Sequence, residues 1–102
     1  MDKNISFSWD AKKNRANERK HSVSFEEALT VFYDEEALLI ADDEHSIEED
    51  RFVMIGMSNL FRILVVCHCY RQKDEEIRII SARKANREER KQYEKLIGRR
   101  RK

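Results

Sequence analysis

Apolar residues recur along the chain with two different periods, that of a strand and that of a helix. Residues 5–9 alternate with the period of two that is typical of a half-buried strand. Residues 11–20 are polar and basic, and they follow Asp10, a favoured helix N-cap. Ser24 and Glu27 have the spacing of a capping box, and apolar residues recur behind them with helical spacing to residues 33–34. The first third of the chain therefore predicts a strand and two helices.

Beyond residue 36, β-branched and aromatic residues gather in four runs, at residues 37–41, 52–58, 61–70 and 77–82. Short polar connections after the second and third runs favour antiparallel hairpins. The run 61–70 is apolar at nearly every position as far as Cys67, as expected of a central strand covered on both faces. Asn86 and Glu89 then form a second capping pair ahead of a final helix, which we expect Gly98 to end.

The predicted order is β-α-α-β-β-β-β-α, which indicates an α+β fold with a mainly antiparallel sheet packed on helices. A chain of 102 residues is long enough for one domain with a modest core and too short for two. We expect that domain to span residues 1–98 and a basic tail to follow over residues 99–102.

The formal net charge of +1 conceals a strong asymmetry. Residues 34–50 carry nine acidic side chains and no Lys or Arg, whereas residues 83–102 carry ten basic side chains against three acidic ones. A polyanion responds to local charge within a Debye length of about 8–10 Å. The segment 78–90, a basic strand leading into a basic helix, is therefore a candidate surface for binding a nucleic acid. The simpler alternative for each charge run is a solvated face.

Cys67 and Cys69 are two positions apart in one apolar run, a spacing that suits neither a disulfide framework nor a zinc knuckle. The three histidines and two cysteines show no recognisable zinc-site spacing, so no metal or cofactor is expected. No apolar stretch near the start of the sequence resembles a signal peptide, and no apolar run approaches the ~20 residues of a membrane span. We expect a soluble, cytoplasmic protein with no membrane partner.

Spaced motifs over most of the chain, from Phe7 to Tyr93, resemble the BrnT family of bacterial toxins. The motifs are FSWD at residues 7–10, KH at 20–21, VSFEEA at 23–28, DEHS at 43–46, IGMS at 55–58, RILVV at 62–66 and IRIISARKA at 77–85. The resemblance implies a fold similar to the RelE and ParE toxins. It also implies a ribonuclease toxin of a type II toxin–antitoxin pair that cuts RNA without a required metal and thereby stops translation.

The same resemblance implies a protein partner, a ribbon-helix-helix antitoxin of the BrnA type, which would neutralise the toxin in a hetero-oligomer. Three positions depart from the family pattern. Ala11, Ser22 and Cys69 stand where the family often has proline, glycine and threonine. The change at Cys69 removes a hydroxyl beside a candidate site, which allows for reduced or altered activity.

Metal-independent RNA cleavage needs a base for the 2′-hydroxyl, cations for the phosphate and an acid for the leaving oxygen. Arg78 and Arg83 are the predicted catalytic cations, and His68 is the predicted acid or base. In a regular strand Arg78 and Arg83 would point to opposite faces, so we expect the strand to end or bulge near Ser81 and Ala82. The alternatives are surface arginines and a satisfied core histidine.

Basic residues of two helices are the predicted RNA phosphate contacts: Lys20, His21, Arg87, Arg90 and Lys91. Tyr93 either stacks on a base or, as we favour, anchors the last helix. Besides a toxin-type endoribonuclease, two other functions fit the sequence. One is a non-catalytic RNA-binding or antitoxin-interaction module on the same fold, and the other is a pure interaction subunit.

Overall fold

The computed structural model describes residues 5–41, 51–73 and 75–100, with side chains up to residue 98. The acidic loop at residues 42–50, which includes His45, lies outside the described residues, as do residues 101–102 of the expected tail. In the described part, none of the helices is both long and apolar enough to cross a membrane.

The elements follow the predicted order β-α-α-β-β-β-β-α, with one short 3-10 turn after the second helix. They are β1 (Ser6–Ser8), α1 (Ala11–His21), α2 (Phe25–Thr30), η1 (Val31–Tyr33), β2 (Leu38–Ala41), β3 (Arg51–Met57), β4 (Ile63–Arg71), β5 (Glu76–Lys84) and α3 (Arg87–Arg100). The predicted stop at Gly98 is wrong, because α3 continues to Arg100. A glycine inside an exposed helix costs only about 1 kcal/mol, which does not suffice to end it.

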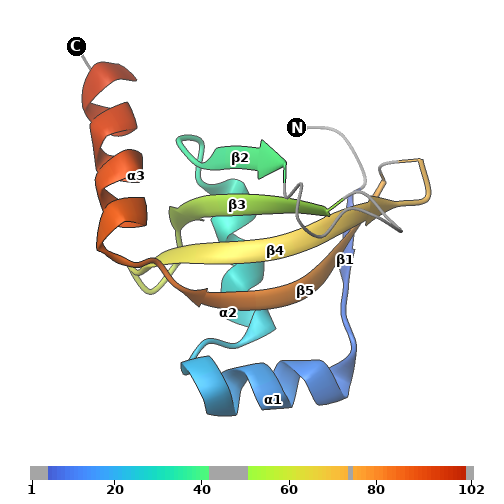
Figure 1. The fold of residues 1–102 in the computed structure, drawn as a ribbon. Coiled ribbons are helices and arrows are strands. Elements are labelled where there is room, and N and C mark those ends of the chain that lie inside the picture. Colours follow the sequence, from blue (N-terminus) through green and yellow to red (C-terminus); the bar gives the residue numbers. More distant parts are fainter. Residues whose placement is uncertain (1–4, 42–50, 74, 101–102) are drawn as a thin grey trace.

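Five strands form one sheet in the order β1-β5-β4-β3-β2 (Figure 1). β1 is parallel to β5, and the other neighbours are antiparallel. The run predicted as the central strand is β4, which has a paired strand on each side and buried residues on both faces. The α+β prediction and the hairpin predictions are thus confirmed.

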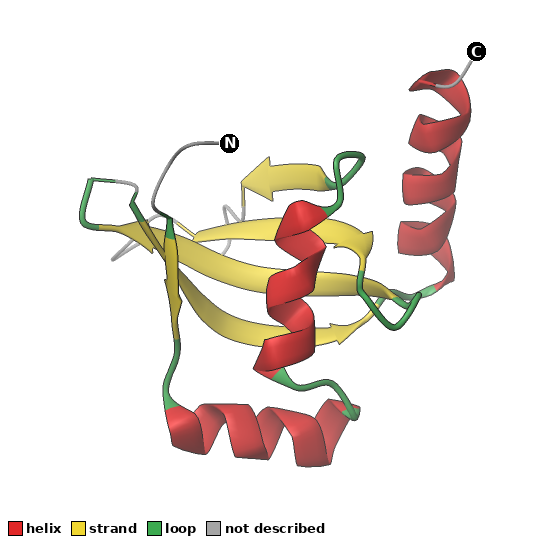
Figure 2. Ribbon diagram, turned by 180° about the vertical axis from the view of Figure 1, so that it is seen from behind, coloured by secondary structure: helices red, strands yellow, loops and turns green. Residues whose placement is uncertain are grey.

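Helices α1 and α2 lie on one side of the sheet, with α2 running across it and α1 along one edge (Figure 2). The core between them is apolar and fully buried. Its residues are Val23, Phe25, Ala28, Val31, Leu64, Val66, Ile79 and Ala82. The buried amide of Asn17 ties α1 to β5, since it donates to the Ala82 carbonyl at 2.8 Å and accepts from the Ala82 amide at 3.1 Å.

The opposite face of the sheet carries a smaller core, where Tyr93 and Ile97 of α3 pack near Ile55 and Val65. Tyr93 is 2% exposed, and its hydroxyl donates to the Asp34 carboxylate. Tyr93 therefore anchors α3, as the favoured interpretation of the sequence predicted. Helix α3 covers only one end of this face (Figure 1).

The predicted irregularity in β5 is present. His68 pairs with Ile79 and Cys67 pairs with Ser81, so Ile80 is an extra residue in β5. Such a bulge shifts the alternation of side chains by one position. Arg78 and Arg83, which would otherwise point to opposite faces, are thereby brought to the same face.

Both predicted capping boxes form, although the first does so only in part. The Ser24 hydroxyl accepts from the Glu27 amide at 3.0 Å, but the Glu27 carboxylate does not reach back. It accepts instead from the Ser58 hydroxyl at 2.6 Å and from the Arg62 guanidinium, so that it joins α2 to the β3–β4 turn. Asn86 and Glu89 make the complete reciprocal box at the start of α3, each bond 2.8 Å long.

Candidate functional site

The face of the sheet that α3 covers at one end displays a grid of side chains set by the strand register. Three rows cross β3, β4 and β5 in turn. They are Arg51, Cys69 and Arg78; Val53, Cys67 and Ser81; Ile55, Val65 and Arg83. From the strand rise, the first and third rows are about 13 Å apart. The arginines therefore flank a central row that carries a thiol and a hydroxyl.

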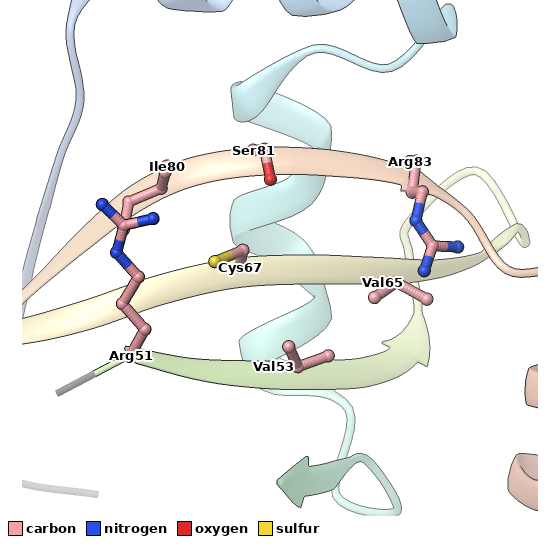
Figure 3. Close-up of a pocket in the computed structure, with 7 residues that line it drawn as sticks. All are labelled: Arg51, Val53, Val65, Cys67, Ile80, Ser81 and Arg83. Atoms are coloured by element: carbon pink, nitrogen blue, oxygen red, sulfur yellow. The ribbon is translucent and has the colours of Figure 1, made fainter. Parts of the chain in front are cut away.

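A shallow pocket of about 270 Å³ lies over the second and third rows and reaches Arg51 of the first. Figure 3 shows Arg51 and Arg83 at opposite ends of the pocket, with Cys67 and Ser81 between them. Ile80, the extra residue of the bulge, lines it as well. Two cationic forks around a hydroxyl form a suitable site for a phosphate group.

The guanidinium of Arg83 is held in place by Glu89. Nη1 donates to Oε1 at 2.8 Å and Nη2 donates to Oε2 at 2.9 Å, while Nη1 also donates to the Lys84 carbonyl at 3.3 Å. The Glu89 carboxylate thus occupies the end of the guanidinium group, where the two terminal nitrogens lie. Within the described residues, the edge formed by Nε and the second hydrogen of Nη2 makes no hydrogen bond and remains available to an anion.

The same ion pair keeps both groups charged. The hydrogen bond to Glu89 raises the pKa of Arg83 and outweighs the effect of its burial. The hydrogen bond from Arg83, together with the amide of Asn86, lowers the pKa of Glu89 although burial opposes it. The Arg83 side chain is still 42% exposed, so it is fixed and accessible at once.

Arg78 lies in the first row and does not line the pocket. Its register partners are Cys69 of β4 and Ser8 of β1, and its Nη1 lies 3.5 Å from the Ser8 hydroxyl. The half-buried Arg78 therefore shares the face of Arg83 but does not line the pocket, whereas Arg51 of the same row does.

His68 is not brought to the arginines, contrary to the predicted site. It lies on the helix-covered face and is 0% exposed, with its ring 4.8 Å from that of Phe32. Nδ1 contacts the Val66 carbonyl at 3.2 Å and Nε2 the Tyr70 hydroxyl at 3.4 Å. Burial lowers the pKa of His68, so the ring is neutral near pH 7. The reason is strand alternation, which turns His68 away from Cys67 and Cys69.

The five predicted RNA contacts lie outside the pocket, on two helices. Lys20 and His21 end α1, where cations also favour the helix terminus. Arg87, Arg90 and Lys91 lie in the first turns of α3, directly after Arg83 along the chain, and Arg90 donates to the Ala85 carbonyl at 3.3 Å. The α3 residues thus lie close to Arg83 along the chain, whereas Lys20 and His21 lie at the end of another helix.

Three pocket-related residues escaped the sequence-based site, namely Arg51, Ser81 and Glu89. Arg51 comes after an acidic loop, and only the β3–β4 register reveals that it faces Cys69. Glu89 was identified as a capping residue, and its second role depends on where Arg83 points after the bulge. Among the described residues, no group of three or more His, Cys, Asp or Glu side chains could hold a metal ion.

Comparisons with known proteins agree with this fold. Among curated proteins there is no significant match. The crystal structure of the ribonuclease toxin BrnT of Brucella abortus matches with a TM-score of 0.62 and 24% identity, over 81% of this chain and 99% of that one. That likeness shows the fold. The family model described as "Ribonuclease toxin, BrnT, of type II toxin-antitoxin system" matches residues 9–89. The chain therefore belongs to the BrnT family of type II toxin–antitoxin systems.

Proposed function

We propose that this chain is an active endoribonuclease toxin that binds the scissile phosphodiester in the pocket between Arg51 and Arg83 and cuts it without a metal ion. The observation that carries the proposal is the bulge at Ile80. It brings Arg83 and Ser81 of β5 to the same face of the sheet as Arg51 of β3, and all three line one pocket. Membership of a ribonuclease toxin family supports RNA as the substrate.

In this reaction the 2′-oxygen of one nucleotide attacks the adjacent phosphorus, and the bond from phosphorus to the 5′-oxygen breaks. The 2′-hydroxyl loses its proton and the departing 5′-oxygen gains one, which leaves a 2′,3′-cyclic phosphate and a 5′-hydroxyl. Negative charge builds up on the phosphate oxygens. Arg83, through its open edge, and Arg51 would neutralise that charge, and the Ser81 hydroxyl would donate a hydrogen bond.

Glu89 acts in this scheme as a positioning residue. It fixes the end of the Arg83 guanidinium, so that the open edge faces the pocket without an ordering cost during the reaction. Arg78 adds charge from the first row. His68 takes no part, because it lies on the opposite face.

RNA cleavage by such a toxin would stop translation, and we propose a ribbon-helix-helix antitoxin of the BrnA type as its partner. Covering the face with Arg51, Arg78 and Arg83 would suffice to block the substrate. The family's toxin–antitoxin description supports a protein partner of this kind.

The test is cleavage of an unstructured RNA by the purified chain in the presence of a chelator. We expect cleavage with cyclic phosphate ends, and Arg83→Gln should lower kcat by about 100-fold or more. Arg15→Gln, an exposed arginine on α1, is the matched control and should retain the parent rate. Abolition of cleavage by the chelator, or an unchanged rate in Arg83→Gln, would contradict the proposal.

A non-catalytic RNA-binding module is the second candidate, and one observation favours it. Among the described residues, no histidine lines the pocket. RNA binding that weakens steeply with salt, without cleavage under any condition, would identify this alternative.

A further inference from the structure

The turn between β3 and β4 exposes an aromatic side chain at a strained backbone position. Phe61 is 86% exposed and has a φ of 62°, in the left-handed region. Glycine or asparagine adopts this conformation readily, whereas a bulky residue there is an outlier. Neither burial nor backbone preference accounts for phenylalanine at this position. A role in binding another molecule would account for it.

The turn is held firmly, so the ring is presented from a rigid support. The Phe61 amide donates to the Ser58 carbonyl at 3.0 Å, and the Ser58 amide donates to the Arg62 carbonyl at 2.8 Å. The buried Glu27 carboxylate accepts from both Ser58 and Arg62. An aromatic ring on a preorganised turn binds a flat ligand at a low entropic cost.

The turn lies beside the β5–α3 junction, as both ribbon views show (Figures 1 and 2). The Ala85 amide donates to the Ile63 carbonyl at 2.9 Å, which fixes this proximity. Arg62 and Arg83 are each paired with a glutamate here. The excess positive charge comes from exposed residues at the same end, including Lys84 and Arg87.

Phe61 is also close to the pocket along the chain. Val65 lines the pocket and lies four residues away, so their Cα atoms are separated by at most about 14 Å. A few nucleotides of single-stranded RNA bridge that distance. Phe61 is thus within reach of a strand whose phosphate occupies the pocket.

We propose that Phe61 is a stacking platform for an unpaired RNA base next to the scissile phosphate. This inference rests on the proposed function and adds a substrate-positioning site to it. Stacking on an aromatic ring is tolerant of sequence, because every base has a π-face. Phe61 therefore selects single-stranded RNA over duplex rather than one base over another.

The experiment measures binding of a short unpaired RNA whose 2′-hydroxyls are methylated, which prevents cleavage. Phe61→Gly should lower the affinity by about 5- to 100-fold, the range for one stacked base. It should leave the salt dependence unchanged, because no cation is removed. Its melting temperature should not fall, since glycine relieves the left-handed strain. Phe61→Tyr should bind as the parent does, and Leu60→Ala, which is 60% exposed in the same turn, is the matched control.

A direct readout of stacking comes from Phe61→Trp. Its indole emission should be quenched by the RNA, while the native Trp9, which packs on Phe25 in the helix-covered core, supplies the background in the parent chain. A Phe61→Gly chain that binds RNA as tightly as the parent would overturn the stacking site alone. A loss of affinity accompanied by a lower melting temperature would also overturn it. Failure of the parent chain to bind RNA at all would overturn the proposed function with it.

Discussion

The ion pair with Glu89 holds the Arg83 guanidinium in place and still leaves part of it free to bind an anion. The carboxylate occupies the end of the guanidinium, and among the described residues the side edge makes no hydrogen bond. Glu89 is in turn fixed by the helix cap, because its own amide donates to Asn86 at 2.8 Å. The position of the predicted catalytic cation is therefore set by the start of α3.

Glu89→Gln should disturb this positioning without removing a phosphate ligand. We expect kcat to fall by about 10-fold with little change in KM, since a misplaced charge mainly affects the transition state. Glu88→Gln changes an exposed neighbour on the same turn and should have no effect. Equal losses in both variants would mean that overall charge, and not the Arg83 contact, matters.

His68 is the clearest difference between the sequence-based site and the structure. We expect His68→Phe to cleave RNA within about threefold of the parent rate per folded molecule, because the ring lies in the core on the far side of the sheet. Cleavage assays normalised to the folded fraction by circular dichroism would check this. A loss of 100-fold or more would restore His68 to the mechanism.

At the scale of elements, the bulge in β5 determines what the open face can do. Its presence was predictable, since the spacing of Arg78 and Arg83 demanded an irregularity if both were to act together. The position of the bulge at Ile80 was not predictable, because it depends on cross-strand pairing with Cys67 and His68. Arg51 was missed for the same reason, as its neighbour across the sheet is 18 residues away along the chain.

Local signals predicted the elements better than the site. Capping residues such as Ser24 and Asn86 act within one helical turn, so sequence spacing alone revealed them. The stop at Gly98 failed because a single glycine is a weak signal, and the backbone can continue through it as a helix at a small cost.

Helix α3 depends on Tyr93 for its attachment. Tyr93→Phe removes the hydroxyl that donates to the Asp34 carboxylate while the ring still fills the core. We expect the free energy of unfolding to fall by about 1.5–2 kcal/mol, typical of a hydrogen bond to a charged group. Urea denaturation would measure it. Tyr33→Phe, at a residue 72% exposed, should be neutral, and equal effects in both variants would refute the anchoring role.

For the whole molecule, the main core and the proposed phosphate site lie on opposite faces of the sheet. One face buries the main core under α1 and α2, and the other leaves cations exposed beside α3. The Glu27 carboxylate joins α2 to the β3–β4 turn through Ser58 and Arg62.

This arrangement predicts a loss of stability in acid. Burial alone would raise the pKa of Glu27, but hydrogen bonds from Arg62 and Ser58 hold it below the ordinary 4.5. The contribution of Glu27 to the free energy of unfolding is thus complete above about pH 4.5. It is lost as the pH falls through the pKa that Glu27 has in the folded state. Burial lowers the pKa of His68 from 6.5, so that residue weakens the fold as the pH falls below about 6.5.

Thermal unfolding between pH 7 and pH 3 would separate the two effects. Glu27→Gln should cost about 2 kcal/mol at pH 7 and flatten the curve below pH 4.5. The exposed Glu35→Gln should do neither. His68→Phe should flatten only the part below pH 6.5. Parallel curves for all variants would show that neither group is responsible.

The most direct test of the shared phosphate pocket is a double-mutant cycle between Arg51 and Arg83. The rate constant kcat/KM for RNA cleavage is measured in chelator for the parent, Arg51→Gln, Arg83→Gln and the double variant, each checked for folding. If both arginines hold one phosphate, the double variant should lose far less than the product of the two single losses, with a coupling energy of about 1 kcal/mol or more. Independent, multiplicative losses would contradict a single pocket that holds the scissile phosphate.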